Sequence, residues 1–377
     1  MKYMGSKRSM LSNGLGAVIS SVVPKYERFV DLFTGSGAVA WHVAERYEVE
    51  VVASDLQEFC IALAAAVLFR TEGDGLLGIQ NWLAESFELL QQSPLYPEAV
   101  DIQSQLFDVP IAELAQRAIR FCQTNGGPIF SAYGGYYYSP LQALSLDVLR
   151  QNLPDRRERS SLYLAALIWA ASRCAASPGH TAQPFKPNET AGKYVAEAWN
   201  REIFGATEQA AKTIAPLYAK RQGRVFKTDA LDLAASLRPG DIAFLDPPYS
   251  GVHYSRFYHV LETLASHMHF EVTGTGRYPP VEHRPQSAYS RQSEATKAFE
   301  VLLKTLSDVG SSAIVTFPAG IASNGLSGRV VKEIADKYFH IEGLIVTGRF
   351  STLGGNLKNR EARQPAEELI LTMTPRR

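Results

Sequence analysis

The sequence predicts an α/β protein whose largely parallel sheet is interrupted by a second, mostly helical domain. The first observation is a set of short, almost continuous apolar runs, the pattern of strands covered on both faces. These runs span residues 27–33, 49–55, 224–227, 241–246 and 312–318. The second observation is that helix-like segments lie between some of them, at residues 38–47, 58–70, 295–307 and 329–337. Such alternation is typical of an open, doubly wound sheet.

Two more apolar runs lie near the end of the chain, at residues 340–350 and 367–373. No helical pattern separates them, so we interpret them as a hairpin.

The stretch between the second and third predicted strands breaks the alternation. It contains helical patterns at residues 75–91, 111–122, 141–152, 160–175 and 191–219, and turn-rich pieces at 124–140 and 177–192. An insertion of this size at one point of a sheet is best interpreted as a domain. The expected division is therefore one domain of residues 1–72 and 224–377 and an inserted domain of residues 73–223.

Composition and charge narrow the class of protein. The chain has 377 residues, of which 46% are hydrophobic and 20% charged, with acidic and basic residues in equal number. Its three cysteines, Cys60, Cys122 and Cys174, have neither metal-site nor disulfide-framework spacing, which fits a reducing cytosol. The polar, basic start and the absence of a long apolar run predict neither a signal peptide nor a membrane span. We expect a cytoplasmic protein.

The charge is unevenly distributed along the chain. Residues 71–116 contain eight acidic residues and no lysine or arginine, whereas residues 150–224 contain twelve basic and six acidic residues. A neutral protein of this kind can present a basic face to phosphates.

The first candidate site is DLFTGSGAVA, residues 31–40, where a strand ends and a helix begins. Gly35 and Gly37 let the backbone approach a ligand, and the helix N-terminus offers free N–H groups. Asp55 ends the next strand, where an acid holds ribose hydroxyls. The motif alone fits an ordinary turn, and its Gly-x-Gly-x-x-Ala spacing also fits a dinucleotide.

The second candidate site is DPPY, residues 246–249, which follows the apolar run IAFL. Ligands of open α/β sheets bind at this end of the strands. Asp246 and a neighbouring proline carbonyl can together accept both N–H bonds of a heteroaromatic amine, which turns its lone pair toward an electrophilic methyl group. Tyr249 offers a flat face on which a base can stack. The alternative is a Pro-Pro turn with an Asp cap.

These motifs resemble those of the Dam-like adenine-N6 DNA methyltransferases, in the subgroup whose cofactor motif precedes DPPY. The resemblance covers residues 1–70 and 224–377, including the runs at 250–265 and 359–371, and is weak in the middle. The matching residues are Lys2, Tyr3, Gly5, Lys7, Asp31, Phe33, Gly35, Gly37, Asp55 and 246–249.

The resemblance implies a Rossmann-like, seven-stranded methyltransferase sheet that binds S-adenosylmethionine. The residues implied for the cofactor are Tyr3, Lys7, Asp31, Phe33, Gly35, Gly37, Asp55 and Asp229. The residues implied for catalysis are Asp246, Pro247, Pro248 and Tyr249, and no metal is required. For Asp229 a helix N-cap is an equally good interpretation.

The implied activity is site-specific methyl transfer to N6 of an adenine that is flipped out of double-stranded DNA. Residues 73–223 would then recognise the target sequence. Restriction–modification, phage defence or a mobile element is the implied setting, with a cognate endonuclease or other defence proteins as partners and no membrane.

Three other functions stay open at this point. They are methylation of another amine, in RNA adenine or a protein amide; a nicotinamide oxidoreductase, favoured only by the glycine spacing; and a DNA-binding subunit that has kept the fold without the activity.

Three weaker features have two interpretations each. The tyrosines of residues 133–138 suit either base stacking or a packed aromatic loop. The pair His267 and His269 lacks a third metal ligand and is more typical of a surface. The loop 273–291, with Arg277, Arg284 and Arg291, suits phosphate contact or an ordinary solvated loop.

Overall fold

The computed structural model describes residues 7–349 and 365–376 and divides into two compact units. The helical unit comprises Gly73–Leu217 and Ser255–Arg284. The sheet unit comprises the other described residues.

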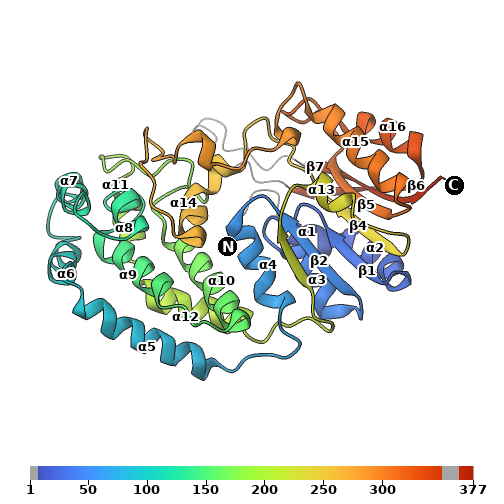
Figure 1. Ribbon diagram of the computed structural model, residues 1–377. Helices are drawn as coiled ribbons and strands as arrows, with labels where there is room; N and C mark the ends of the chain where they lie inside the picture. Colours follow the sequence, from blue (N-terminus) through green and yellow to red (C-terminus); the bar gives the residue numbers. More distant parts are fainter. Residues whose placement is uncertain (1–6, 350–364, 377) are drawn as a thin grey trace. The chain divides into compact units, whose positions relative to one another are not determined.

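Within the described residues, the sheet unit is built on seven strands in the order β3-β2-β1-β4-β5-β7-β6 (Figure 1). The strands are β1 (Arg28–Asp31), β2 (Glu50–Asp55), β3 (Arg224–Lys227), β4 (Asp241–Leu245), β5 (Ser312–Pro318), β6 (Phe339–Arg349) and β7 (Pro365–Pro375). The first five pair in parallel, and β7 runs antiparallel between β5 and β6. The predicted sheet and its closing hairpin are confirmed.

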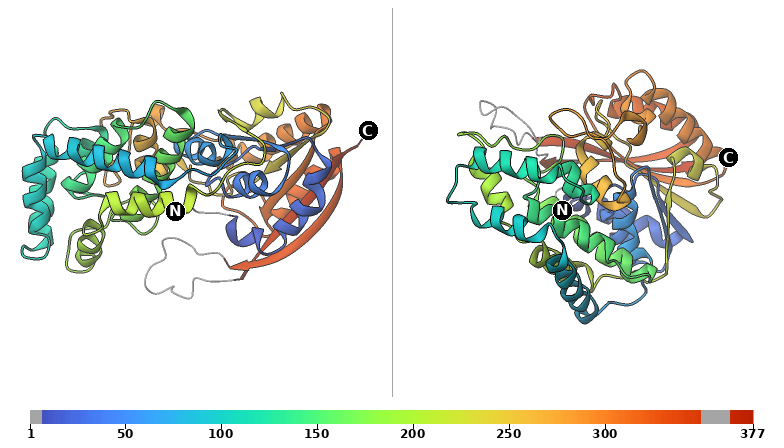
Figure 2. Two further views of the ribbon diagram at one scale, coloured as in Figure 1. Left: turned by 90° about the horizontal axis from the view of Figure 1, so that it is seen from below. Right: turned by 60° about the vertical axis from the view of Figure 1, so that its left-hand side comes forward.

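Alternate residues of the central strands bury against helices on opposite faces, which explains why these runs are continuously apolar. In β4, Ile242 and Phe244 join one core cluster while Ala243 and Leu245 join the other. Figure 2 shows helices on both faces of the sheet. The first cluster includes residues of α2 (Leu15–Val22), α3 (Ala38–Arg46) and α4 (Glu58–Leu68), and the second those of α13 (Ala230–Ala234), α15 (Ala295–Asp308) and α16 (Gly328–Tyr338).

The helical unit contains nine of the described α-helices. They are α5 (Leu76–Gln92), α6 (Tyr96–Ser104), α7 (Ile111–Cys122), α8 (Pro128–Tyr133), α9 (Pro140–Gln151), α10 (Arg157–Cys174), α11 (Gly192–Trp199), α12 (Ile203–Ile214) and α14 (Ser255–Ser266). Helix α9 begins with a capping box, in which Ser139 and Gln142 each accept a hydrogen bond from the other's backbone N–H.

The helical pattern predicted over residues 191–219 forms two helices, α11 and α12, and ends at Ile214. The chain breaks after Trp199, and Glu202 begins α12 by accepting a hydrogen bond from the Phe204 backbone N–H at 2.7 Å. The Gln142 amide donates to the carbonyls of Ala198 and Arg201, so the break itself packs against α9. A buried polar contact of this kind is not visible in the apolar pattern.

The unit boundary also differs from the expected one, because residues 255–284 pack with the helical unit. Thr263 of α14 shares a hydrogen bond with the Tyr133 hydroxyl at 2.9 Å, and Arg150 donates to the Ala265 carbonyl at 2.8 Å. These residues return to the helical unit after the DPPY motif. No helix in the described part of the chain has the length and apolar character needed to cross a membrane.

Candidate active site

The glycine turn after β1 lies at the edge of the sheet where the parallel strands end. Gly35 and Gly37 have φ values of +51° and +74°, a region that L side chains rarely adopt. The Gly35 backbone N–H donates to Asp55 Oδ2 at 2.9 Å, which joins this turn to the end of β2. Gly37 is the N-cap of α3, so the turn leads directly into a helix N-terminus.

Two acidic residues flank this turn. Asp31 is buried, and its Oδ1 accepts the Phe33 backbone N–H at 3.3 Å. Asp55 Oδ1 accepts the Gln57 backbone N–H at 3.0 Å. Burial raises the pKa of both carboxyl groups, and the neighbouring carboxylates of Asp246 and Asp55 raise the pKa of Asp31 further, well above its usual range.

Phe33 and Asp229 lie beside a residue that the sequence analysis did not connect with them. Tyr289 is buried and meets the Phe33 ring edge-on, with 5.0 Å between ring centroids. Asp229 caps α13 by accepting the Leu231 backbone N–H at 2.9 Å, so its N-cap interpretation is confirmed. Tyr289 lies near the end of the predicted loop 273–291, but it packs against the core of the sheet unit, where the charge of Asp229 acts on its hydroxyl.

The DPPY motif follows β4 directly, at the same edge of the sheet. Asp246 Oδ1 has two partners: Lys7 Nζ at 3.0 Å and the Thr316 hydroxyl, which donates at 3.1 Å. The other oxygen, Oδ2, has no hydrogen-bond partner in residues 7–349 and 365–376, and the side chain is 15% exposed. Within the described residues, one carboxylate oxygen is therefore anchored and the other has no partner.

A buried ion pair lies behind this carboxylate. Lys7 Nζ is 3.4 Å from Glu368 Oε1 on β7, and both side chains are almost completely buried. Burial alone would lower the pKa of Lys7, but the carboxylates of Asp246 and Glu368 outweigh it and raise that pKa. Neither Glu368 nor Thr316 belongs to a motif that predicts this site. The signal was a charged residue inside an otherwise apolar strand.

The proline backbone of the motif is held from the other side by Asn324. This buried amide donates to the Pro248 carbonyl and to the Tyr289 carbonyl, both at 2.9 Å. No contact in the described residues occupies the Pro247 carbonyl in this way. Tyr249 packs edge-on against Phe317, and Lys7 Nζ lies 5.6 Å from the centroid of its ring.

The structure thus brings together most of the residues predicted for the site. Asp31, Phe33, Gly35, Gly37, Asp55 and Asp229 lie at or beside the ends of β1, β2 and β3, and residues 246–249 follow β4. Lys7 contacts the DPPY motif, so its predicted cofactor contact stays a prediction. Tyr3 lies outside the described residues.

The weaker candidates have structural explanations. Tyr133, Tyr137 and Tyr138 are fully buried with their hydroxyls hydrogen-bonded, so the packed-loop interpretation is correct for them. His267 pairs with Asp147 at 3.2 Å, and no group of residues suited to a metal occurs in the described chain.

The arginine loop is partly engaged within the chain. Arg277 donates to the Ala132 carbonyl at 2.7 Å and lies over the Tyr136 ring, and Arg291 pairs with Glu294 at 2.9 Å. Phosphate contact by this loop stays a prediction.

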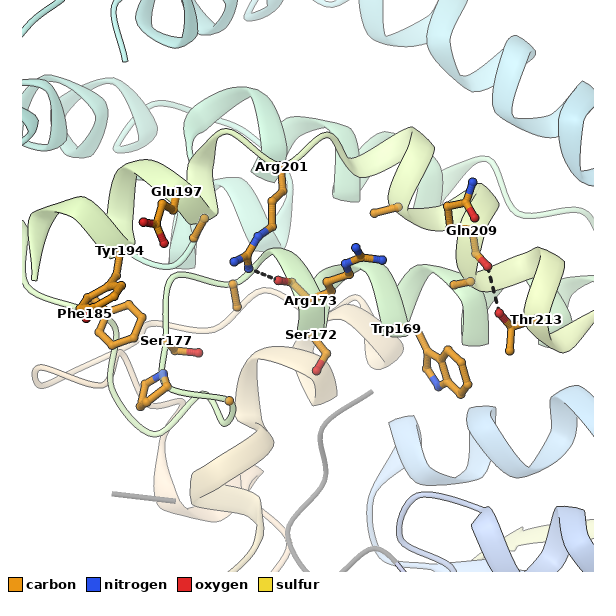
Figure 3. Close-up of a pocket in the computed structure, with 16 residues that line it drawn as sticks. Trp169, Ser172, Arg173, Ser177, Phe185, Tyr194, Glu197, Arg201, Gln209 and Thr213 are labelled. Atoms are coloured by element: carbon orange, nitrogen blue, oxygen red, sulfur yellow. Dashed lines mark hydrogen bonds between the residues drawn. The ribbon is translucent and has the colours of Figure 1, made fainter. Parts of the chain in front are cut away.

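The helical unit contains an open groove of about 840 Å³ between α10 and the α11–α12 pair (Figure 3). Trp169, Ser172 and Arg173 line it from α10, and Tyr194 and Glu197 line it from α11. Arg201, in the turn before α12, donates to the Arg173 carbonyl. The groove therefore combines two arginines with aromatic side chains.

The profile of the D12 class N6 adenine-specific DNA methyltransferases matches residues 3–124 and 135–311. The chain belongs to this family. That assignment agrees with the strand order and with the position of DPPY after β4.

Individual relatives agree with the family assignment. The type II methyltransferase M.FokI of Planomicrobium okeanokoites is 24% identical over 98% of this chain and 51% of its own length. The modification methylase LlaI of Lactococcus lactis subsp. lactis is 25% identical over 81% of this chain and 44% of its own length. The type II methyltransferase M.NlaIII of Neisseria lactamica is 24% identical over 81% of this chain and 80% of its own length. The chain thus spans about half the length of the first two relatives.

Proposed function

We propose that the protein transfers a methyl group from S-adenosylmethionine to the N6 amine of adenine in double-stranded DNA. The observation that carries this proposal is the asymmetry of Asp246. Its Oδ1 is anchored by Lys7 and Thr316, and its Oδ2 accepts no hydrogen bond from the described residues. An acceptor held in this way is suited to an amine, which is itself a donor.

The chemistry follows from the weakness of the nucleophile. The lone pair of adenine N6 is delocalised into the ring, so the amine must be turned toward tetrahedral geometry before it attacks. Asp246 Oδ2 and the Pro247 carbonyl accept its two N–H bonds, while Asn324 already occupies the Pro248 carbonyl. Tyr249 provides the stacking face. Positioning of this kind provides most of the rate in transfers between two held reactants.

The acidic residues around the glycine turn fit a cationic cofactor. Asp55 and Asp246 lie close enough to Asp31 for their negative charges to raise its pKa. A cation bound nearby would relieve this repulsion. S-adenosylmethionine supplies a methyl group on a positively charged sulfonium. A dinucleotide would instead bring the negative charge of its pyrophosphate. We propose that Asp31, Phe33, Gly35, Gly37, Asp55 and Asp229 hold the cofactor, together with Tyr289.

DNA recognition is assigned to the helical unit, residues 73–217 and 255–284. All adenines are alike once flipped, so discrimination must come from contacts with neighbouring base edges. Arg173, Lys186, Gln183 and Asn188 are all exposed. The two basic side chains are suited to contacts with phosphates, and the two amides are suited to contacts with base edges. The groove beside Arg173 and Arg201 is a further place where the sugar–phosphate backbone fits. We also propose that the protein acts together with partner proteins, such as a cognate endonuclease.

Methylation-sensitive sequencing of DNA from cells that express the protein tests this function. We expect N6-methyladenine at one short sequence motif, and none in cells that express Asp246→Ala. Purified enzyme with labelled cofactor extends the test to RNA and protein. Label in RNA or protein but not in DNA would show that DNA is not the substrate. Absence of transfer to DNA, RNA and protein would favour a DNA-binding protein that has kept the fold without the activity.

A further inference from the structure

The most unusual buried group outside the predicted motifs is Glu368. Its side chain is 1% exposed, and Oε1 lies 3.4 Å from Lys7 Nζ. The second oxygen, Oε2, is buried without a hydrogen-bond partner in the described residues. A buried carboxylate oxygen of this kind is costly, because desolvation is not repaid by a contact. Stability alone therefore does not explain an acid at this position.

The fold places Glu368 beside the catalytic carboxylate through the antiparallel strand. In the β5–β7 register, Glu368 is opposite Pro318 and Ile370 is opposite Thr316. Because side chains alternate along a strand, Thr316 and Glu368 belong to the same face of the sheet. Thr316 donates to Asp246, and Glu368 reaches the same carboxylate through Lys7.

The directions available to Lys7 are limited. An ammonium group has three hydrogens. Asp246 Oδ1 and Glu368 Oε1 lie within ion-pair distance, and the Tyr249 ring lies 5.6 Å away. Without Glu368, the ammonium would be drawn by Asp246 alone and would be free to move along that carboxylate toward Oδ2.

We propose that Glu368 is a positioning residue, which holds the Lys7 ammonium on Asp246 Oδ1 and so keeps Oδ2 available for the target amine. This inference rests on the proposed function. Glu368 acts through Lys7 and does not touch the reacting atoms.

The ionisation of Glu368 gives the proposal a measurable signature. Burial and the negative charge of Asp246 raise the pKa of Glu368, and Lys7 offsets this only in part, so that the pKa is about 7. Of the neighbouring groups, the Tyr254 hydroxyl acts on Lys7, and Asp31 is close to Asp246. As the pH falls through about 7, Glu368 gains a proton and loses its hold on Lys7.

The test compares Glu368→Gln with Glu367→Gln, whose side chain is the exposed carboxylate next to it on β7. We expect Glu368→Gln to lower kcat about tenfold or more with little change in KM for DNA or cofactor. The wild-type decline in kcat below pH 7 should disappear in this variant. Glu367→Gln should keep both the rate and the pH profile.

A double-mutant cycle with Lys7→Met separates positioning from general damage. If Glu368 acts through Lys7, adding Glu368→Gln to Lys7→Met should cost almost nothing further. Additive losses, or an unchanged pH profile in folded Glu368→Gln, would overturn the proposal. Cofactor titration and thermal unfolding show whether Glu368→Gln has folded. If it has not, Glu368→Asp, whose side chain is one methylene shorter, serves as the second variant. We expect the same loss in kcat from it. Absence of any transfer by the wild-type enzyme would count against the proposed function instead.

Discussion

The Gly35 backbone N–H donates to Asp55 Oδ2 at 2.9 Å, which fixes the glycine turn to the end of the neighbouring strand. One carboxylate thus shapes the turn and is also the acid predicted to hold the ribose hydroxyls. The two roles are compatible, because each carboxylate oxygen has more than one lone pair.

Replacement of Asp55 by Ala should therefore weaken S-adenosylmethionine binding at least about tenfold, since both the turn and the ribose contact are lost. Calorimetric titration measures this directly. The matched control is Glu58→Gln, which removes an exposed charge paired with Lys227 just after the same strand. Equal affinities in both folded variants would remove Asp55 from the cofactor site.

Gly35→Ala should both destabilise the fold and weaken cofactor binding. The φ of +51° is unfavourable for an L residue by about 1–2 kcal/mol. Gly240→Ala is the matched control, because Gly240 has a φ of +92° and open space around it but lies before β4, at the opposite end of that strand from DPPY. Thermal unfolding should show a loss in both variants, and titration a loss of affinity only for Gly35→Ala. A similar affinity loss in Gly240→Ala would mean that strain alone explains the effect.

Asn324→Ala should lower kcat more than it changes KM, because the Pro248 carbonyl loses its donor and the backbone of residues 246–249 is no longer fixed. Loss of a buried hydrogen-bond partner costs about 1–3 kcal/mol, so a lower unfolding temperature should accompany it. Asn13→Ala, which removes a similar contact to the Thr347 carbonyl at an exposed position, is the control. Unchanged kcat in Asn324→Ala would show that the loop does not need this anchor.

Arg173→Ala should weaken DNA binding and reduce its salt dependence by about one unit of slope if the groove holds a phosphate. Arg329→Ala, at an exposed position on α16 of the sheet unit, should leave the slope unchanged. Binding to one duplex at several salt concentrations gives both values. If the slope of Arg173→Ala equals that of the wild type, the groove is not a phosphate site.

Substitution of Gln183 or Asn188 should instead relax the methylated sequence, at about 1–3 kcal/mol for each lost bidentate base contact. Sequencing of the methylated sites made by each variant is the measurement. A changed site from variants in the loop 273–291 alone would place recognition in that loop.

The contribution of Glu368 to the free energy of unfolding should fall as the pH rises from about 4.5 to about 7, whereas the lowered pKa values of His42 and His259 act in the opposite direction. The pKa of Glu368 rises from its ordinary 4.5 to about 7 in the folded protein, so the folded state binds more protons in this range. The raised pKa values of Asp31, Asp55 and Asp246 act in the same direction. Chemical unfolding at pH 5 and pH 7 should show a smaller difference in Glu368→Gln than in the wild type. An identical difference would contradict the raised pKa.

Local patterns predicted the central strands well because these strands are buried on both faces. The run at 312–318 matches the buried strand β5 residue for residue, and the run at 224–227 matches β3, a mostly exposed strand at the edge of the sheet. The pattern failed where a polar contact decided the structure, as at the break between α11 and α12, which Gln142 and Glu202 stabilise. The short helix α8 and the return of residues 255–284 to the helical unit carry no comparable local signal.

The sequence predicted those residues of the candidate site that belong to a short local motif after a strand. Gly35, Asp55 and Asp246 each stand at the end of an apolar run, and such ends share one edge of a parallel sheet. Glu368, Thr316 and Asn324 act through contacts that the β5–β7 pairing and the loop after β5 create. No spacing in the sequence connects Glu368 with Lys7, because their proximity depends on the position of β7 within the sheet.

The role of Asp246 is tested most directly by the rate of methyl transfer to adenine in duplex DNA. Wild-type protein and Asp246→Ala are compared with labelled S-adenosylmethionine, and the modified nucleoside is identified after digestion. We predict N6-methyladenine from the wild type and a rate about 100- to 1,000-fold lower from Asp246→Ala, with cofactor and DNA affinity retained. A near wild-type rate in that variant, or label on a different atom, would contradict the assignment of Asp246 as the acceptor of the adenine amine.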